Sequence, residues 1–230
     1  MPQNHQNYFR CFEVSLLKKD FKMKIVSYIL VLVLLVSCTN KTEKLSLKPK
    51  KGQEVAIFAS GCFWCTEHIF ESLVGVDDVI SGYTGGTIKN PYYEYVSSNK
   101  TGHAESVAVF YDPKVISYQE LVNVFFISQD PTTPDQQGPD RGSSYRSIAF
   151  YKNETEKKII EEKIKQLTDN KVYNSPIVTE VVPVGDFYEA ESYHQNYVKN
   201  NPNQPYVRGV SLPRYEKFKN DYKGKLKPNS

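Results

Sequence analysis

Two cysteines, Cys62 and Cys65, flank Phe63 and Trp64 in the stretch SGCFWCTEH. Thiols at this spacing can hold a metal, form a structural disulfide or act as a redox pair. A zinc site needs about four nitrogen or sulfur ligands, usually in two clusters, whereas this chain has one CxxC and scattered histidines. A disulfide that closes so short a loop removes little chain entropy, so it stabilises weakly. The spacing therefore favours redox exchange.

The residues around the motif predict that it lies where a strand turns into a helix. EVAIFAS (54–60) is short and β-prone, Ser60-Gly61 interrupts it, and apolar residues then recur at near-helical spacing up to Leu73. A thiol at a helix N-terminus faces the positive end of the helix dipole and unpaired N–H groups, which favour the thiolate. We therefore expect Cys62 to be a thiolate nucleophile and Cys65, one turn later, to lie within its reach.

The remaining segments predict an α+β fold, a two-layer mixed β-sheet with packed helices, because strands and helices do not strictly alternate. Strands are expected over 76–86, 103–112, 146–152 and 177–184, and helices over 113–129, 153–169 (capped by Asn153 or Thr155) and 188–201. Two long polar loops, 87–102 and 130–145, separate these elements. Loops of this length on a compact scaffold are typical of a functional site.

The N-terminus reads as a targeting segment. A basic lead, an apolar run over 25–36 and the ending LVSC at Cys38 are typical of a secretory signal, and the run is shorter than the roughly 20 residues that span a bilayer. LVSC resembles a bacterial lipobox, which implies cleavage before Cys38 and acylation of its thiol; a plain signal peptide or a hydrophobic anchor is the alternative. Translation can start at Met1 or at Met23, and a start at Met23 omits Cys11.

Four regions follow from composition along the chain. They are a signal region (1–38), a polar, disordered tether (39–53), the catalytic domain (54–222) and a basic, solvated tail (223–230). The 29 Lys+Arg nearly balance the 26 Asp+Glu, so the chain has no electrostatic footprint for nucleic acid. We expect a monomer that is lipid-anchored in the bacterial cell envelope and faces the periplasm or the exterior.

GCFWCTE resembles the active-site signature of peptide-methionine (S)-S-oxide reductases, the A-type methionine sulfoxide reductases. The similarity continues through GYTGGTIKNPYYEYVSSNKTGHAESVAVFYDP, DPTTPDQQGPDRGSSYRS and YHQNYVKNNPNQPYV, in the family's order, from about Val55 to Phe218. It implies a ferredoxin-like core and reduction of the S epimer of methionine sulfoxide, free or in proteins. It also implies no bound cofactor or metal, and a thioredoxin-like protein or another dithiol as electron donor.

The resemblance implies a role for residues in several motifs. They are a nucleophile (Cys62), walls of a methyl pocket (Phe63, Trp64), a proton donor to the sulfoxide oxygen (Glu105), two hydroxyls that bind that oxygen (Tyr93, Tyr145) and an organising carboxylate (Asp140). The chemistry needs such groups, because a sulfoxide oxygen leaves poorly until it is protonated and a carboxyl in an apolar pocket can supply the proton. Taken singly, each residue could equally be an ordinary core or surface side chain. His103 is expected to be structural, while Glu191 and His194 either support the site or are core residues.

The chain departs from the family at two positions. Many members have glycine where Cys65 stands, and a resolving cysteine where this chain has Val207. We expect Cys65 to attack the Cys62 sulfenic acid; the alternative is that Cys65 only packs and an external thiol reduces Cys62. Two other functions stay open, a CxxC thiol–disulfide exchanger and a methionine-binding module. An exchanger has no use for Glu105 and the two tyrosines, and a binding module needs no Cys62.

Overall fold

The central sheet of the computed structural model, which describes residues 44–228, has six strands. The strands are β1 (Glu54–Ser60), β2 (Val76–Thr84), β3 (Ala104–Tyr111), β6 (Ser147–Tyr151), β7 (Glu180–Pro183) and β8 (Tyr188–Glu189), in the order β7-β6-β1-β3-β2-β8. All neighbours are antiparallel except β6 and β7. The signal region, with Cys11 and the proposed lipid site Cys38, lies outside the described residues.

The four inner strands and two helices form a ferredoxin-like unit. α2 (Phe63–Glu71) connects β1 to β2, and α4 (Tyr118–Ile127) lies between β3 and β6, which gives the order β-α-β-β-α-β. The strand order β6-β1-β3-β2 and the antiparallel pairing are those of this motif. The predicted α+β fold is therefore confirmed.

Further helices, a hairpin and single turns complete the domain. They are α3 (Tyr93–Ser97), the hairpin β4 (Gln136–Gln137) and β5 (Asp140–Arg141), α5 (Glu154–Asp169), α6 (Tyr197–Asn200) and α7 (Leu212–Asp221), with single 3₁₀ turns at Ser143–Tyr145 and Ser192–His194 and a π turn at Val207–Ser211. Asn153 caps α5 as predicted, because its side chain accepts the backbone N–H of Glu156 at 3.0 Å. The helix expected over 188–201 is instead β8, a 3₁₀ turn and α6.

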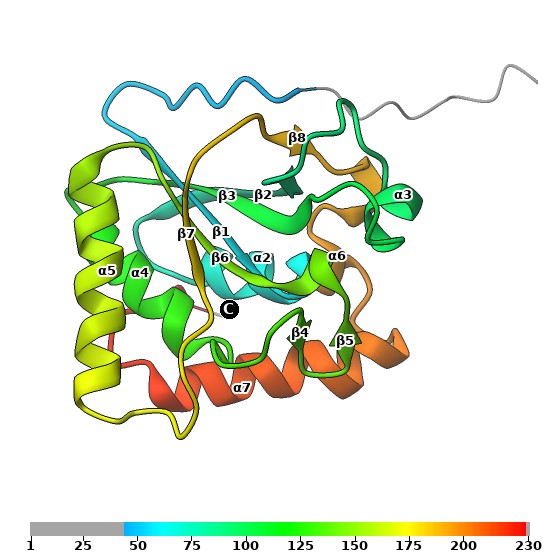
Figure 1. Cartoon of the computed structure of the whole chain (residues 1–230). Helices are drawn as coiled ribbons and strands as arrows, with labels where there is room; N and C mark the ends of the chain where they lie inside the picture. The colour runs from blue at the N-terminus through cyan, green and yellow to red at the C-terminus, as the bar shows by residue number, and fades with distance from the viewer. Residues whose placement is uncertain (1–43, 229–230) are drawn as a thin grey trace, which may run out of the picture. The chain divides into compact units, whose positions relative to one another are not determined.

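The helices cover one face of the sheet (Figure 1). On that face Phe58 stacks between Phe70 and Phe125, with ring centroids 5.3 and 5.1 Å apart. Alternate β1 residues, Val55 and Ile57, point to the other face and form a smaller cluster. The cores are filled by aromatic and aliphatic side chains, and the described residues contain no methionine. Every large core side chain is therefore stiff, which favours a single packed arrangement.

The segment before β1, which was expected to be a disordered tether, packs against the sheet. Leu45 and Leu47 pack against the second cluster, and the Leu45 N–H donates to the Phe187 carbonyl at 2.9 Å. Lys44 forms an isolated antiparallel β-bridge with Tyr188. In Figure 1 this segment runs along the side of the sheet away from α7. The expected disorder of the tether is therefore wrong for residues 44–53, because their two leucines cover an apolar sheet face.

The C-terminal segment is also less solvated than its lysines suggest. Phe218 and Tyr222 are buried, and backbone hydrogen bonds join residues 225–227 to residues 72–74. Tyr215 and Phe218 form the buried face of α7 and its two lysines flank that face, so a basic composition concealed an amphipathic helix. Among residues 44–228, no helix has the length and apolar character needed to cross a membrane.

Candidate active site

Gly61 directs the chain from β1 into α2. Its φ of +80° lies in the left-handed region, and a Cβ there would come within 2.4 Å of the Gln137 side chain. Only glycine tolerates both conditions without strain. The turn makes Cys62 the N-cap residue of α2 and leaves its side chain 6% exposed. The predicted strand-to-helix position of the motif is confirmed.

Glu105 lies on β3, directly beside the start of α2. Its carboxyl is 2% exposed, and Oε2 accepts the backbone N–H of Phe63 at 3.0 Å. Burial raises the pKa of Glu105 to about 8, although the Phe63 N–H acts in the opposite direction. The carboxyl therefore keeps its proton at neutral pH, as a general acid at this position must.

Two phenols face this carboxyl. They are Tyr93, at the start of α3, and Tyr145, at the end of a 3₁₀ turn. Burial, and then the charge of Glu105, raise the pKa of both hydroxyls above the ordinary value for tyrosine. Two neutral O–H groups thus lie next to one carboxylic acid, an arrangement that can hold an oxygen on which negative charge develops.

Trp64 forms an aromatic wall next to Cys62. Its ring stacks on Tyr197, with centroids 3.7 Å apart and planes at 8°, and it meets the edge of Tyr206 at 5.8 Å. The indole N–H donates to His194 Nδ1 at 3.0 Å. Phe63 is 1% exposed, so it supports the wall from beneath. Such a wall accepts a small apolar group beside the nucleophile.

Glu191 and His194 contact the site walls. The Glu191 carboxylate accepts the Tyr83 hydroxyl at 2.9 Å and the Tyr93 backbone N–H at 3.0 Å. Burial lowers the pKa of His194 to about 4, so the ring is neutral. Because Nδ1 accepts the bond from Trp64, the proton lies on Nε2, which is 4.0 Å from a Glu191 oxygen. Both residues therefore position Trp64 and Tyr93.

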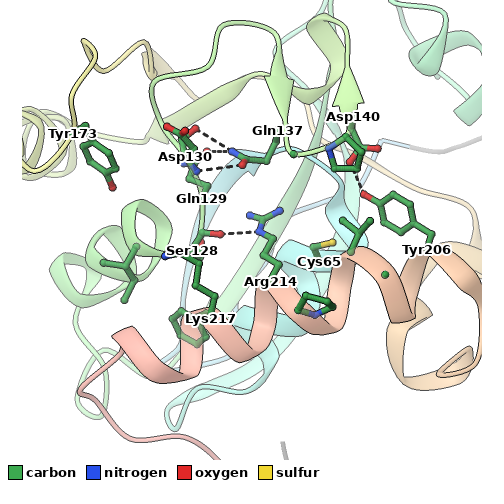
Figure 2. A pocket seen from close by; sticks show the side chains of 17 residues that line it. Cys65, Ser128, Gln129, Asp130, Gln137, Asp140, Tyr173, Tyr206, Arg214 and Lys217 are labelled. Atoms are coloured by element: carbon green, nitrogen blue, oxygen red, sulfur yellow. Dashed lines mark hydrogen bonds between the residues drawn. The ribbon is translucent and has the colours of Figure 1, made fainter.

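Cys65 faces a different environment, on the α7 side of α2. Its Sγ lies 3.1 Å from the Ser211 hydroxyl and borders a pocket of about 540 Å³. Arg214 lines the same pocket and donates to the Ser128 carbonyl at 2.7 Å and to Ser60 Oγ at 3.1 Å (Figure 2). At the rim, Asp140 on β5 accepts the Tyr206 hydroxyl. The Ser211 hydroxyl and the Arg214 cation thus lie near the second thiol, with the Asp140 carboxyl at the rim of the pocket.

The two thiols are free and differ in acidity. A hydrogen bond from Cys62 lowers the pKa of Cys65 to about 6, with further support from Arg214 and Ser211. Burial raises the pKa of Cys62, and the charges of Cys65 and Glu105 raise it further. These surroundings favour the protonated form of Cys62, against the expectation of a thiolate there. The backbone N–H of Phe63, at the start of the helix, could have stabilised a Cys62 thiolate, but it donates to Glu105 instead.

The structure brings together most of the residues singled out from the sequence. Cys62, Phe63, Trp64, Tyr93, Glu105 and Tyr145 gather at the start of α2, and Cys65 and Asp140 lie at its other side. His103 is structural, with Nδ1 accepting the Gly86 N–H at 3.1 Å. Tyr197, Tyr206 and Arg214 were not singled out, since no local pattern marks them. No group of three possible metal ligands occurs among residues 44–228.

The fold and the paired thiols beside a protonated carboxyl define a thiol-dependent oxidoreductase. Residues 54–226 match the family model "Peptide methionine sulfoxide reductase". The chain is 46% identical over 191 residues to the MsrA of Deinococcus radiodurans, covering 83% of this chain and 93% of that protein. It is 48% identical over 172 residues to the MsrA of Sulfolobus acidocaldarius, covering 75% and 97%.

Solved structures agree. Reduced Mxr1 from Saccharomyces cerevisiae superposes with a TM-score of 0.61 at 33% identity, over 68% of this chain and 90% of that one. Methionine sulfoxide reductase A of Corynebacterium diphtheriae gives 0.61 at 30% identity, over 71% and 83%. The chain belongs to the peptide methionine sulfoxide reductase family. It is an oxidoreductase that reduces methionine sulfoxide.

Proposed function

We propose that the chain reduces the S epimer of methionine sulfoxide, free or in proteins, in two thiol steps carried by Cys62 and Cys65. One observation carries the proposal. The first turn of α2 presents Cys62 to a protonated Glu105 and two phenols, and carries Cys65 one turn away. A thiol–disulfide exchanger has no need of the acid or the phenols.

In the first step the Cys62 sulfur attacks the sulfoxide sulfur. Tyr93 and Tyr145 bind the sulfoxide oxygen, and Glu105 protonates it, while Cys65, the more acidic thiol, takes up the Cys62 proton. The net result is transfer of one oxygen atom: Cys62–SH and the sulfoxide become Cys62–SOH and the thioether. The S-methyl group lies against Trp64, which separates this substrate from other polar side chains.

In the second step Cys65 attacks the sulfenic acid. A Cys62–Cys65 disulfide forms, and the hydroxyl leaves as water with the Cys65 proton. The CxxC spacing supports this step, because Cys62 caps α2 and Cys65 lies in its first turn. A thioredoxin-like protein or another dithiol then reduces the disulfide.

Stereospecificity is tested with the two epimers of a methionine sulfoxide peptide, each supplied with dithiothreitol. The S epimer is expected to be reduced and the R epimer left intact, because the methyl wall and the oxygen-binding groups fix two of the sulfur substituents. Equal turnover of both epimers would contradict the proposal.

Resolution by Cys65 is tested by mass spectrometry after one equivalent of substrate, without reductant. Wild-type protein is expected to lose two hydrogens as a Cys62–Cys65 bridge. Cys65→Ser is expected to retain a sulfenic acid that dimedone traps. Wild-type steady-state rates for Cys65→Ser with thioredoxin as donor would show that Cys65 only packs.

We also propose that the protein is exported and anchored through an acylated Cys38, so that it repairs oxidised proteins of the cell envelope. The basic lead, the short apolar run and the LVSC ending support this. A labelled fatty acid is expected to mark wild-type protein and to leave Cys38→Ala unmarked. Unlabelled wild-type protein in the cytosol would refute the proposal.

A further inference from the structure

The two phenols of the site lie on separate loops. Tyr93 opens α3 within loop 87–102, and Tyr145 ends the 3₁₀ turn of loop 130–145, which packs against β3. Loop 87–102 contains no strand, and the two strands of loop 130–145, β4 and β5, pair only with each other. The relative position of the phenols therefore depends on contacts other than those of the central sheet.

Arg146, which directly follows the 3₁₀ turn, joins three segments through one guanidinium. Its Nη1 donates to the Ser143 carbonyl at 2.7 Å, its Nη2 to the Gly102 carbonyl at 3.0 Å, and its Nε to a Glu180 carboxylate oxygen at 3.1 Å. Gly102 ends loop 87–102, two residues before β3 begins, and Glu180 opens β7. The Arg146 side chain is only 15% exposed. A planar guanidinium fixes the directions of its acceptors, so this contact sets the turn against both neighbours.

Asn99 makes a second connection between the same two loops. Its Oδ1 accepts the backbone N–H of Ser144 at 2.9 Å. Ser144 is fully buried, so its N–H needs an acceptor within the protein. Gly142 lies so close to the carboxamide that a Cβ there would come within 2.4 Å of it. Asn99 has a φ of +62°, a left-handed conformation that asparagine adopts more readily than most residues.

We propose that Arg146 and Asn99 are positioning residues that hold the Tyr145 hydroxyl against the sulfoxide oxygen. The inference rests on the proposed binding of that oxygen by Tyr145. Both side chains act on the backbone of the turn, at Ser144 and Ser143, one and two residues before Tyr145. A donor stabilises developing charge when it is fixed in advance at bonding distance, and a misplacement of about 1 Å can cost on the order of a hundredfold in rate.

Arg146→Lys tests the guanidinium. Lysine keeps the positive charge, but its ammonium lacks the planar fork that bonds three acceptors at once. Arg141 provides the matched control, because it is exposed on β5 in the same loop and donates to Gln136 of its own hairpin. The measurement is single-turnover reduction of methionine sulfoxide at saturating substrate, without reductant. Arg146→Lys is expected to slow it about tenfold, and Arg141→Lys to leave it unchanged.

Asn99→Ala tests the second connection separately. The substitution removes the acceptor of the buried N–H and leaves alanine in the left-handed region. Asn90 is exposed in the same loop with a φ of +49°, so Asn90→Ala imposes a similar backbone strain and is the matched control. Asn99→Ala is expected to slow the single turnover about threefold or more. Asn99→Asp keeps an oxygen at the same place, and its rate is expected to match wild type, as is that of Asn90→Ala.

A double-mutant cycle separates positioning from a general loss of structure. In a Tyr145→Phe background the positioned hydroxyl is missing, so Arg146→Lys should slow the reaction by less than about twofold. If Arg146→Lys does not fold, Asn99→Ala completes the same cycle. Equal slowing in both backgrounds, or wild-type rates in both Arg146→Lys and Asn99→Ala, would overturn the inference and leave the proposed reaction standing. A wild-type rate in Tyr145→Phe would instead overturn the proposed role of Tyr145, and this inference with it.

Discussion

The two sides of the first turn of α2 are built in opposite ways. Around Cys62 the neighbours are aromatic rings, phenols and a carboxyl that keeps its proton, and no cation lies among them. Cys65 contacts the Ser211 hydroxyl and borders a pocket lined by Arg214 and Asp140. One side holds protons on its groups, while Arg214 and Ser211 on the other lower the pKa of the Cys65 thiol. The difference indicates that two thiols a single helical turn apart can be given opposite surroundings.

The largest expected effect comes from removing the thiol on the apolar side. Without reductant, wild-type protein should reduce one equivalent of methionine sulfoxide, and Cys62→Ser should reduce none, because the hydroxyl is a far weaker nucleophile toward sulfur. Cys65→Ser should still reduce one equivalent, more slowly, since Cys62 is retained. The product is counted by chromatography. Substantial product from Cys62→Ser would mean that the two sides have been assigned the wrong way round.

Glu105→Gln should slow the reduction step by roughly 10²–10⁴, the usual range for general acid catalysis. The amide oxygen can still accept the Phe63 N–H, so the fold should persist. Because the pKa of Glu105 is about 8, the wild-type single-turnover rate should fall as pH rises through that value, and the variant should lack this decline. Alkylation of Cys62 serves as the control for an intact nucleophile. Rates within a few-fold of wild type would remove Glu105 from the chemistry.

A second buried carboxyl, that of Glu67, makes the stability of the protein depend on pH. Glu67 is 1% exposed, accepts the Asn196 N–H at 3.0 Å, and burial raises its pKa to about 8. Its folded pKa exceeds its unfolded value, so its stabilising contribution is complete at low pH and is lost as pH rises through about 8. The free energy of unfolding should fall between pH 5 and pH 8. Glu67→Gln should reduce that fall by on the order of 2 kcal/mol. Urea unfolding at both pH values tests this, and equal slopes in both proteins would contradict it.

The smallest expected effect concerns the cation on the other side. Arg214→Gln should raise the pKa of Cys65, and a rise of about one unit would lower its thiolate fraction near pH 6 about fivefold. Arg214→Lys keeps the charge and is the matched control. Alkylation of Cys65 against pH, resolved from Cys62 by mass, gives the readout. An unchanged profile in Arg214→Gln would show that the hydrogen bond from Cys62 is sufficient by itself.

The elements that bear the site could be predicted from the sequence because their signals are local. The β-prone run before Gly61, the helical spacing after it and the Asn153 cap all act within a few residues. What could not be predicted depends on contacts between distant segments. Arg214 reaches Cys65 only because α7 packs against α2, and Phe63 donates to Glu105 only because β3 lies beside β1. The pKa shifts of the two cysteines follow from those contacts, which the helix-dipole argument for Cys62 did not include.

The absence of methionine from residues 44–228 has a consequence beyond packing. Oxidation of a core methionine adds a polar oxygen to an apolar side chain and loosens the packing around it. A core filled by rings and branched aliphatic side chains offers no such target, so the domain can work among oxidants without becoming its own substrate. Its vulnerable sulfur is confined to Cys62 and Cys65, the two atoms that each catalytic cycle returns to the reduced state.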